Sequence, residues 1–169
     1  MNRLIPAATV LTAVILQAGV VPYIAIAGIT PNALLLAAVT IALVKGSRAG
    51  MLSGFAAGLL FDLMGTGPIG AAALVFCLVG FIAASIKENT FSEGWLLPLV
   101  VVFFASLTAE VAYALVLAVL GEGAFSVTGV LRLALPAALY VSLSALFIYP
   151  WVARFLRSEK PMTTFRRLA

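Results

Sequence analysis

Residues 49–64 read AGMLSGFAAGLLFDLM, and this stretch indicates how the whole chain is built. It is apolar for most of its length, its glycines recur at every fourth position, and its carboxylate, Asp62, comes near the end. Glycine at every fourth position leaves a smooth groove along a helix, so that the backbone of another helix can approach closely. The stretch therefore predicts a membrane helix that packs tightly against a neighbour.

The composition extends this expectation to the full chain. Of 169 residues, 64% are apolar and 9% are charged, and the mean hydropathy is +1.21. Soluble domains carry about 25% charged residues, so this chain is expected to be solvated by lipid. A membrane-spanning helix needs about 20 apolar residues. Six stretches approach that length: residues 4–21, 29–44, 49–64, 69–86, 95–120 and 130–153.

We therefore predict an all-α polytopic membrane protein with six transmembrane helices. Residues 1–153 would form a single domain, and residues 154–169 a basic cytoplasmic tail. The stretch 29–44 is short for a crossing, and Gly28 and Pro31 interrupt its beginning. Pro31 suits the first turn of a helix, where its missing N–H costs nothing. A re-entrant or partly buried short helix remains an alternative here.

Lysine and arginine occur mainly in alternate connections between the predicted spans. Basic residues precede the first span, separate the second from the third and the fourth from the fifth, and follow the sixth; Arg132 is the exception. Cytoplasmic loops carry the excess of Lys and Arg. This pattern predicts a multi-pass protein of the bacterial inner membrane with both termini in the cytoplasm.

The residue types present exclude several kinds of chemistry for the isolated chain. Histidine is absent and Cys77 is the only cysteine, so we expect no disulfide, no metal site, no Cys–His catalysis and no cofactor. Cys77 is expected to pack as a small apolar residue. The net charge of +4 follows from the basic loops, so no nucleic-acid partner is expected. The tail is expected to contact anionic membrane lipids.

Glu110 is a carboxyl group well inside the fifth predicted span. Ser106 and Tyr113 flank it at helical spacing, which makes one polar stripe on an otherwise apolar helix. An ionised carboxylate costs at least about 2.5 kcal/mol at such a depth, so Glu110 should face other helices or a hydrated cavity, or be protonated. The stripe is either a ligand or proton site or an interhelical hydrogen bond that fixes packing.

The glycine stretch and the break after it supply a second group of candidate residues. Asp62 either caps the backbone of the following turn or binds a partner, and Arg132 could pair with Asp62 or with Glu122. The close-approach face packs against a helix of this chain or of another protein. The remaining acidic residues, Glu88, Glu93, Glu122 and Glu159, are expected to be ordinary solvated charges. The residues that we assign to partner binding or helix packing are Gly50, Gly54, Gly58, Asp62 and Pro68.

These segments together resemble the MreD family of the bacterial rod-shape system. The similarity rests on TPNALLL at residues 30–36, the basic turn KGSR at 45–48, GMLSGFAAGLLFDL at 50–63 and GPIGAAAL at 67–74, followed by Gly80. It covers about residues 30–86, while the C-terminal half matches mainly in length and hydropathy. Family members often carry an aspartate where this chain has Asn32.

The resemblance implies a non-enzymatic scaffold with a fold like that of the substrate-binding subunits of energy-coupling-factor transporters. MreD-like proteins bind the bitopic membrane protein MreC. They work with the actin-like MreB and with a peptidoglycan synthase to elongate the lateral cell wall. The chain would thus support peptidoglycan synthesis and cell shape.

Two other functions remain open. The first is a vitamin-binding transporter subunit, although the Ala-x-x-x-Ala motif that such subunits present in their first helix is degraded here: Leu11 follows Ala7, and Thr12 follows Ala8, at that spacing. The second is an outward-facing cavity for a lipid or small molecule near Glu110. A proton-coupled transporter fits less well, because the two halves of the chain show no visible repeat.

Overall fold

The computed structural model describes residues 4–26, 28–90, 96–122 and 125–157, which form a bundle of α-helices. A 3₁₀ turn, η1 (Val21–Ile24), follows the first helix, and the described residues contain no strand beyond an isolated bridge between Ile26 and Ile29. The six α-helices are α1 (Leu4–Gly19), α2 (Ala33–Lys45), α3 (Ser47–Met64), α4 (Ala71–Glu88), α5 (Leu96–Val119) and α6 (Val127–Arg157). The all-helical prediction is confirmed.

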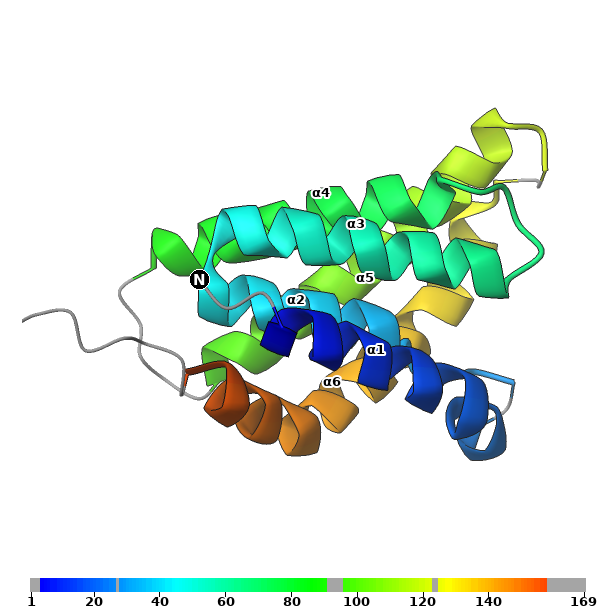
Figure 1. Ribbon diagram of the computed structural model, residues 1–169. Helices are drawn as coiled ribbons and strands as arrows, with labels where there is room; N and C mark the ends of the chain where they lie inside the picture. Colours follow the sequence, from blue (N-terminus) through cyan, green and yellow to red (C-terminus); the bar gives the residue numbers. More distant parts are fainter. Residues whose placement is uncertain (1–3, 27, 91–95, 123–124, 158–169) are drawn as a thin grey trace, which may run out of the picture.

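Consecutive helices run in opposite directions along the bundle. The turn between α2 and α3, the end of α4 and the end of α6 lie at the left of Figure 1, whereas the turn between α3 and α4 lies at the right. Each predicted apolar stretch corresponds to one α-helix, with ends that differ by a few residues. The described part of the predicted tail is the last turn of α6, and residues 158–169 lie outside the described residues.

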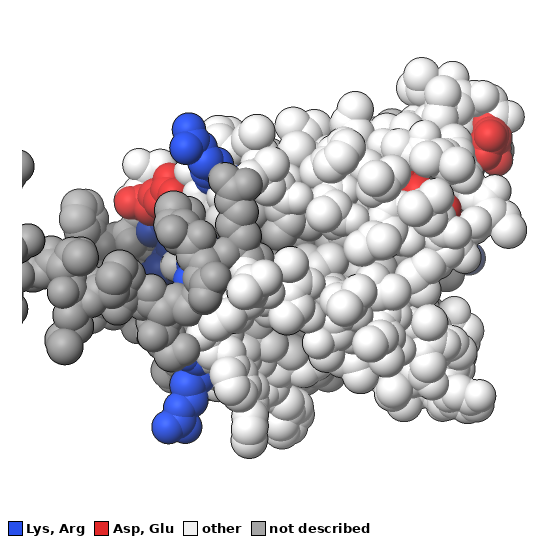
Figure 2. Space-filling model, viewed as in Figure 1, with Lys and Arg blue, Asp and Glu red and all other residues white. Residues whose placement is uncertain are grey.

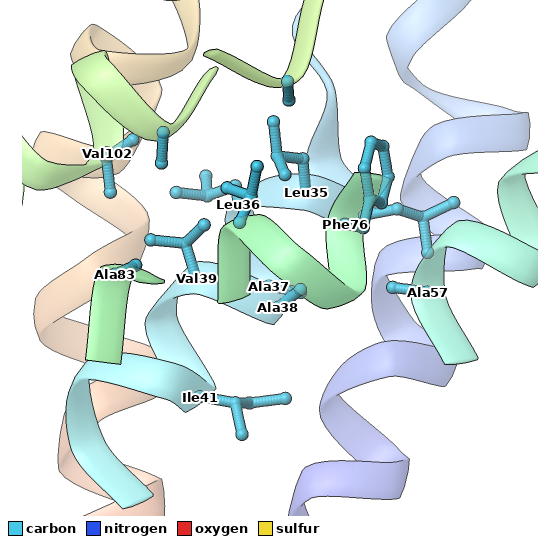
Figure 3. Packing of buried hydrophobic residues seen from close by; sticks show 14 of the residues in the cluster. Leu35, Leu36, Ala37, Ala38, Val39, Ile41, Ala57, Phe76, Ala83 and Val102 are labelled. Atoms are coloured by element: carbon cyan, nitrogen blue, oxygen red, sulfur yellow. The ribbon is translucent and has the colours of Figure 1, made fainter. Parts of the chain in front are cut away.

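The core of the bundle is α2. Every residue from Leu34 to Leu43 is buried, and Figure 3 shows Leu35 and Val39 of this helix among Phe76 and Val102 of its neighbours. A helix that is apolar on all sides is buried rather than amphipathic. The hydroxyl of Thr40, the polar side chain within this run, donates to the Leu36 carbonyl at 2.8 Å. Thus α2 presents almost no polar atom to the helices that surround it.

Two side chains fix the point at which α2 begins. The Asn32 side-chain oxygen accepts a hydrogen bond from the Leu35 N–H at 2.9 Å, and Gln17 Oε1 of α1 accepts from the Ala33 N–H at 2.8 Å. The first amides of a helix have no partner within the helix, so both contacts satisfy groups that would otherwise be unpaired in an apolar region. Pro31 precedes α2 rather than lying in its first turn, which corrects the expected start at residue 29.

The outer surface is that of a membrane protein. Among the described residues, α4, α5 and α6 are long and apolar enough to cross a membrane, and α1 and α2 are shorter apolar helices. Large apolar side chains such as Leu74, Phe104 and Phe147 are exposed. In Figure 2 the charged side chains gather towards the two ends of the visible face, and the long region between them is almost free of charge. Such a surface is suited to lipid rather than water.

The last helix is longer than the sequence suggested. The predicted span covers residues 130–153, but α6 begins at Val127, ends at Arg157 and continues through both Pro136 and Pro150. Helix-breaking proline is tolerated in membrane helices, because neighbouring groups satisfy the backbone that it frees. Because α6 begins at Val127, only a short connection separates it from the end of α5 at Val119.

Candidate functional site

The glycine face of α3 packs against α4 within the same chain. A Cβ built on Gly54 would overlap the Phe76 carbonyl, and one built on Gly58 would overlap the Ala72 carbonyl. Gly50 meets Gly80 in the same way, since a Cβ on Gly50 would lie 2.6 Å from the Gly80 carbonyl oxygen. These distances are too short for any side chain. The backbone of α4 therefore occupies the groove that the sequence predicted.

Asp62 joins the end of α3 to the start of α4. Its carboxylate is 3% exposed and accepts three backbone hydrogen bonds, from Gly70 at 2.9 Å, from Ala72 at 3.0 Å and from Ala73 at 3.1 Å. A carboxylate at a helix N-terminus satisfies unpaired amides and complements the positive end of the helix dipole. Of the two roles expected for Asp62, the structure shows the capping geometry.

The turn between α3 and α4 makes this cap possible. Gly70 has φ +105°, a left-handed conformation that favours glycine. Pro68 lies in the same turn, and its carbonyl accepts from the Ala71 N–H at 3.3 Å. The amides of the first turn of α4 consequently point towards the Asp62 carboxylate.

Glu88 has the corresponding role at the opposite end of the same helix pair. It ends α4, and its carboxylate accepts from the Ser47 N–H at 2.9 Å and from the Ser47 hydroxyl at 3.0 Å, where α3 begins. Each of the two antiparallel helices therefore carries near its end a carboxylate that caps the beginning of the other. Glu88 is exposed, as expected for a solvated charge, but the sequence did not predict that it also caps α3. The sequence contained one indication of this cap. The residue before α3 is Gly46, which has no side chain that could cap the helix.

The polar stripe of α5 has a different character. Ser106 is completely buried, and its Oγ has no hydrogen-bond partner among the described residues. Glu110 is half-buried, and among the described residues it has neither a hydrogen bond nor an ion pair. Tyr113 packs edge-on against Phe61 with 6.5 Å between ring centroids. The structure thus places the three side chains along one side of α5 without hydrogen bonds between them.

Two apolar grooves open on the surface, and Glu110 lines neither. One, of about 580 Å³, lies between α6 and the turn that holds Ile26 and Ile29. The other, of about 550 Å³, lies between α1 and α6 with α2 as its floor. The threonine hydroxyls of the second groove are already bonded within their own helices: Thr9 donates to the Ile5 carbonyl at 2.9 Å and Thr12 to the Ala8 carbonyl at 2.8 Å. Its walls are consequently apolar.

The described residues bring together no group of three or more metal-ligating side chains. The free thiol of Cys77 is half-buried within α4. Most of the polar side chains in the described bundle cap helices or donate to the carbonyl of the preceding turn. The fold and its polar contacts define an all-helical membrane protein built around a tightly packed, mutually capped helix pair.

Comparison with known proteins gives the family. A family model described as rod shape-determining protein MreD matches residues 1–159, which is nearly the whole chain. The chain belongs to the MreD family, a family of shape-determining membrane proteins that is not a known enzyme family. The resemblance seen in the sequence is therefore confirmed. Searches of curated proteins and of solved structures found no match.

Proposed function

We propose that this protein is a non-enzymatic scaffold of the bacterial cell-elongation machinery. In this role it binds an MreC-type bitopic protein in the inner membrane and supports lateral peptidoglycan synthesis together with MreB and the wall synthase. The observation that carries the proposal is the match of the MreD family model to residues 1–159. The apolar surface of the bundle is in keeping with it, since such a surface contacts only lipids and other membrane helices.

We further propose that all six helices cross the membrane and that both termini are cytoplasmic. The distribution of basic residues supports this orientation. Lys45, Lys87 and Arg154 are at or near the ends of α2, α4 and α6, which would all lie on the cytoplasmic side, whereas Arg132 lies near the start of α6. At about 1.5 Å per residue the 13 residues of α2 span about 20 Å, less than the roughly 30 Å hydrocarbon core. The helices around α2 shield its ends from lipid.

The binding surface for the partner is proposed to lie outside the glycine face. Because α4 already occupies that face, Gly54→Leu and Asp62→Ala are expected to weaken partner binding indirectly, through loss of the packed α3–α4 pair. A fold like that of the energy-coupling-factor subunits remains a proposal from resemblance alone. The basic residues 154–169 are proposed to contact anionic lipids at the cytoplasmic surface.

Co-purification tests the proposal directly. The chain is co-expressed with an MreC-type partner, extracted in mild detergent and examined by size-exclusion chromatography. A stable complex of constant stoichiometry is the expected result. Elution of a folded chain without the partner, at concentrations where both are monodisperse, would count against the scaffold.

A second candidate function is favoured by the apolar groove between α1 and α6. Ala8 and Thr12, from the degraded small-residue motif, line this groove together with residues of α2 and α6. A lipid or a vitamin-like molecule could occupy it, as a binder or transporter subunit would require. Mass spectrometry of the purified chain under non-denaturing conditions distinguishes this function, because a bound small molecule would then travel with the protein.

A further inference from the structure

Glu110 is the one charged residue of α5, and it lies inside the part of that helix that crosses the membrane. It is 14 residues from Leu96 and 9 from Val119, the two ends of α5, so at about 1.5 Å per residue it is near the middle of the hydrocarbon core. A carboxyl group at that depth is costly unless a donor satisfies it, and such residues mark functional contacts. For the carboxyl group to be ionised at this depth, the structure must supply a partner, or another molecule must.

This chain supplies none among its described residues. Asp62 and Glu88, at the ends of α3 and α4, each accept several hydrogen bonds. Glu110 accepts none, although it is only half-buried and thus accessible from outside the bundle. The alternative that Glu110 forms an interhelical hydrogen bond within the chain is therefore not what the structure shows.

A second unsatisfied group lies one turn away. Ser106 is fully buried, and its Oγ has no partner in the part of the chain that the structure describes. Hydroxyls elsewhere in the bundle, such as those of Thr40 and Ser142, donate to the carbonyl four residues earlier. Buried polar groups are nearly always paired. Ser106 and Glu110 are four residues apart and lie on the same side of the helix, but only Glu110 is partly exposed and within reach of another protein.

The charge of Glu110 favours a positive donor. Glu110 is the one charged residue of α5, and no cationic side chain among the described residues pairs with it. In a low-dielectric environment an unpaired carboxylate attracts a cationic side chain and disfavours another acid.

We propose that Glu110 binds a basic side chain on a transmembrane helix of the partner protein, which docks on α5 where Glu110 is partly exposed. This inference rests on the proposed scaffold function and names Glu110 as one residue through which the scaffold contacts its partner. The partner helix would supply the donor that the isolated chain lacks. Pairing two otherwise isolated charges in the membrane would make the association specific, because a helix without the donor would leave the carboxylate unsatisfied.

The test measures partner affinity and the stability of the isolated chain for the same variants. Glu110→Leu removes the carboxyl group, and Glu110→Gln keeps its shape and hydrogen-bonding capacity without the charge. Thr108→Leu is the control, since Thr108 is exposed and, two residues away, points about 160° around the helix from Glu110. The dissociation constant for a co-expressed MreC-type partner and the thermal midpoint of each chain alone are measured in one detergent.

The proposal predicts that Glu110→Leu weakens binding at least about 30-fold, the lower range for leaving a buried charge unpaired. Glu110→Gln weakens it less, and Thr108→Leu stays within about twofold of the wild type. The thermal midpoint of isolated Glu110→Leu is equal to or above that of the wild type, because an unpaired carboxyl group has been removed.

Three results would overturn the inference. Wild-type affinity in Glu110→Leu would show that the carboxyl group is not at the interface, and full affinity in Glu110→Gln would exclude a basic donor. A parallel loss of stability in isolated Glu110→Leu would make Glu110 an internal structural residue. Failure of the wild-type chain to bind would instead contradict the scaffold function on which the inference rests.

Discussion

Asp62 illustrates how a single residue organises this fold. Its carboxylate is buried and accepts hydrogen bonds from three backbone amides at the start of α4. No side chain within α4 could provide these contacts, because the helix begins with three alanines after Gly70. Asp62, near the end of the apolar helix α3, therefore caps the beginning of α4.

Replacing Asp62 should destabilise the isolated chain. Asp62→Ala leaves three amides without their acceptor, and we expect a loss of at least about 2 kcal/mol in the free energy of unfolding, since hydrogen bonds to charged groups contribute about 1.5–3 kcal/mol each. Asp62→Asn keeps one acceptor oxygen and should lose less. Thermal unfolding in detergent checks both variants, and an unchanged midpoint for Asp62→Ala would contradict the capping role.

Ser106 should behave in the opposite way. Its hydroxyl is buried and has no partner within the described bundle, so Ser106→Ala removes a polar group that forms no hydrogen bond there. We expect the thermal midpoint of the isolated chain to stay the same or to rise slightly. A drop of several degrees would show that the hydroxyl is bonded in the folded protein.

At the scale of elements, the α3–α4 pair combines backbone contact along its length with a carboxylate cap at each end. The sequence was sufficient to predict the close-packing face, because glycine spacing reports directly on helix approach. The sequence could not show which helix packs against this face. The contacts on the α4 side are made by backbone atoms, which every sequence has, at Ala72, Phe76 and Gly80. The Glu88 cap was missed for a similar reason, as it depends on Ser47, which is distant in the chain.

Gly54→Ala tests the close contact with the smallest possible change. The added methyl group would overlap the Phe76 carbonyl, so the helices must separate, and we expect a clear loss of stability of about 1–3 kcal/mol, as for other overpacked cores. The matched control is Gly19→Ala in α1, where a Cβ meets nothing within 4 Å. Equal thermal midpoints for the two variants would argue against the packed pair.

Glu88→Ala tests the weaker of the two caps. This side chain is exposed, and loss of a helix cap typically costs about 1 kcal/mol, so the decrease in thermal midpoint should be smaller than that of Asp62→Ala. Unfolding of the three proteins in the same detergent gives the order directly. A larger effect for Glu88→Ala than for Asp62→Ala would contradict our assignment.

At the scale of the whole molecule, hydropathy predicted the number and order of the helices because each apolar stretch is separated by a short polar break. It did not predict which helix lies at the centre. The reason is physical: in a lipid-solvated bundle both core and surface are apolar, so α2 and the exposed faces of α4 to α6 have similar composition. Asn32 stands where family members often have an aspartate. Its amide oxygen caps α2 by accepting from the Leu35 N–H, so this cap does not need a charge.

The proposed orientation predicts which end of the bundle a membrane-impermeant reagent can reach from outside the cell. In a Cys77→Ala background, Glu122→Cys at the α5–α6 end should react with a membrane-impermeant thiol reagent in spheroplasts. Asn89→Cys, exposed at the opposite end, should react only after permeabilisation. The reverse labelling pattern would show that the bundle has the opposite orientation in the membrane.

The central claim is that this member of the MreD family is a scaffold that maintains rod shape, and cell shape measures it most directly. The protein is depleted in the bacterium that encodes it, and cell width is followed by microscopy while wild-type or variant chains are supplied in trans. We predict that depleted cells widen and round up, and that the wild type restores rods while a stably inserted Glu110→Leu chain does not. Cells that keep their rod shape and width after complete depletion would contradict the account.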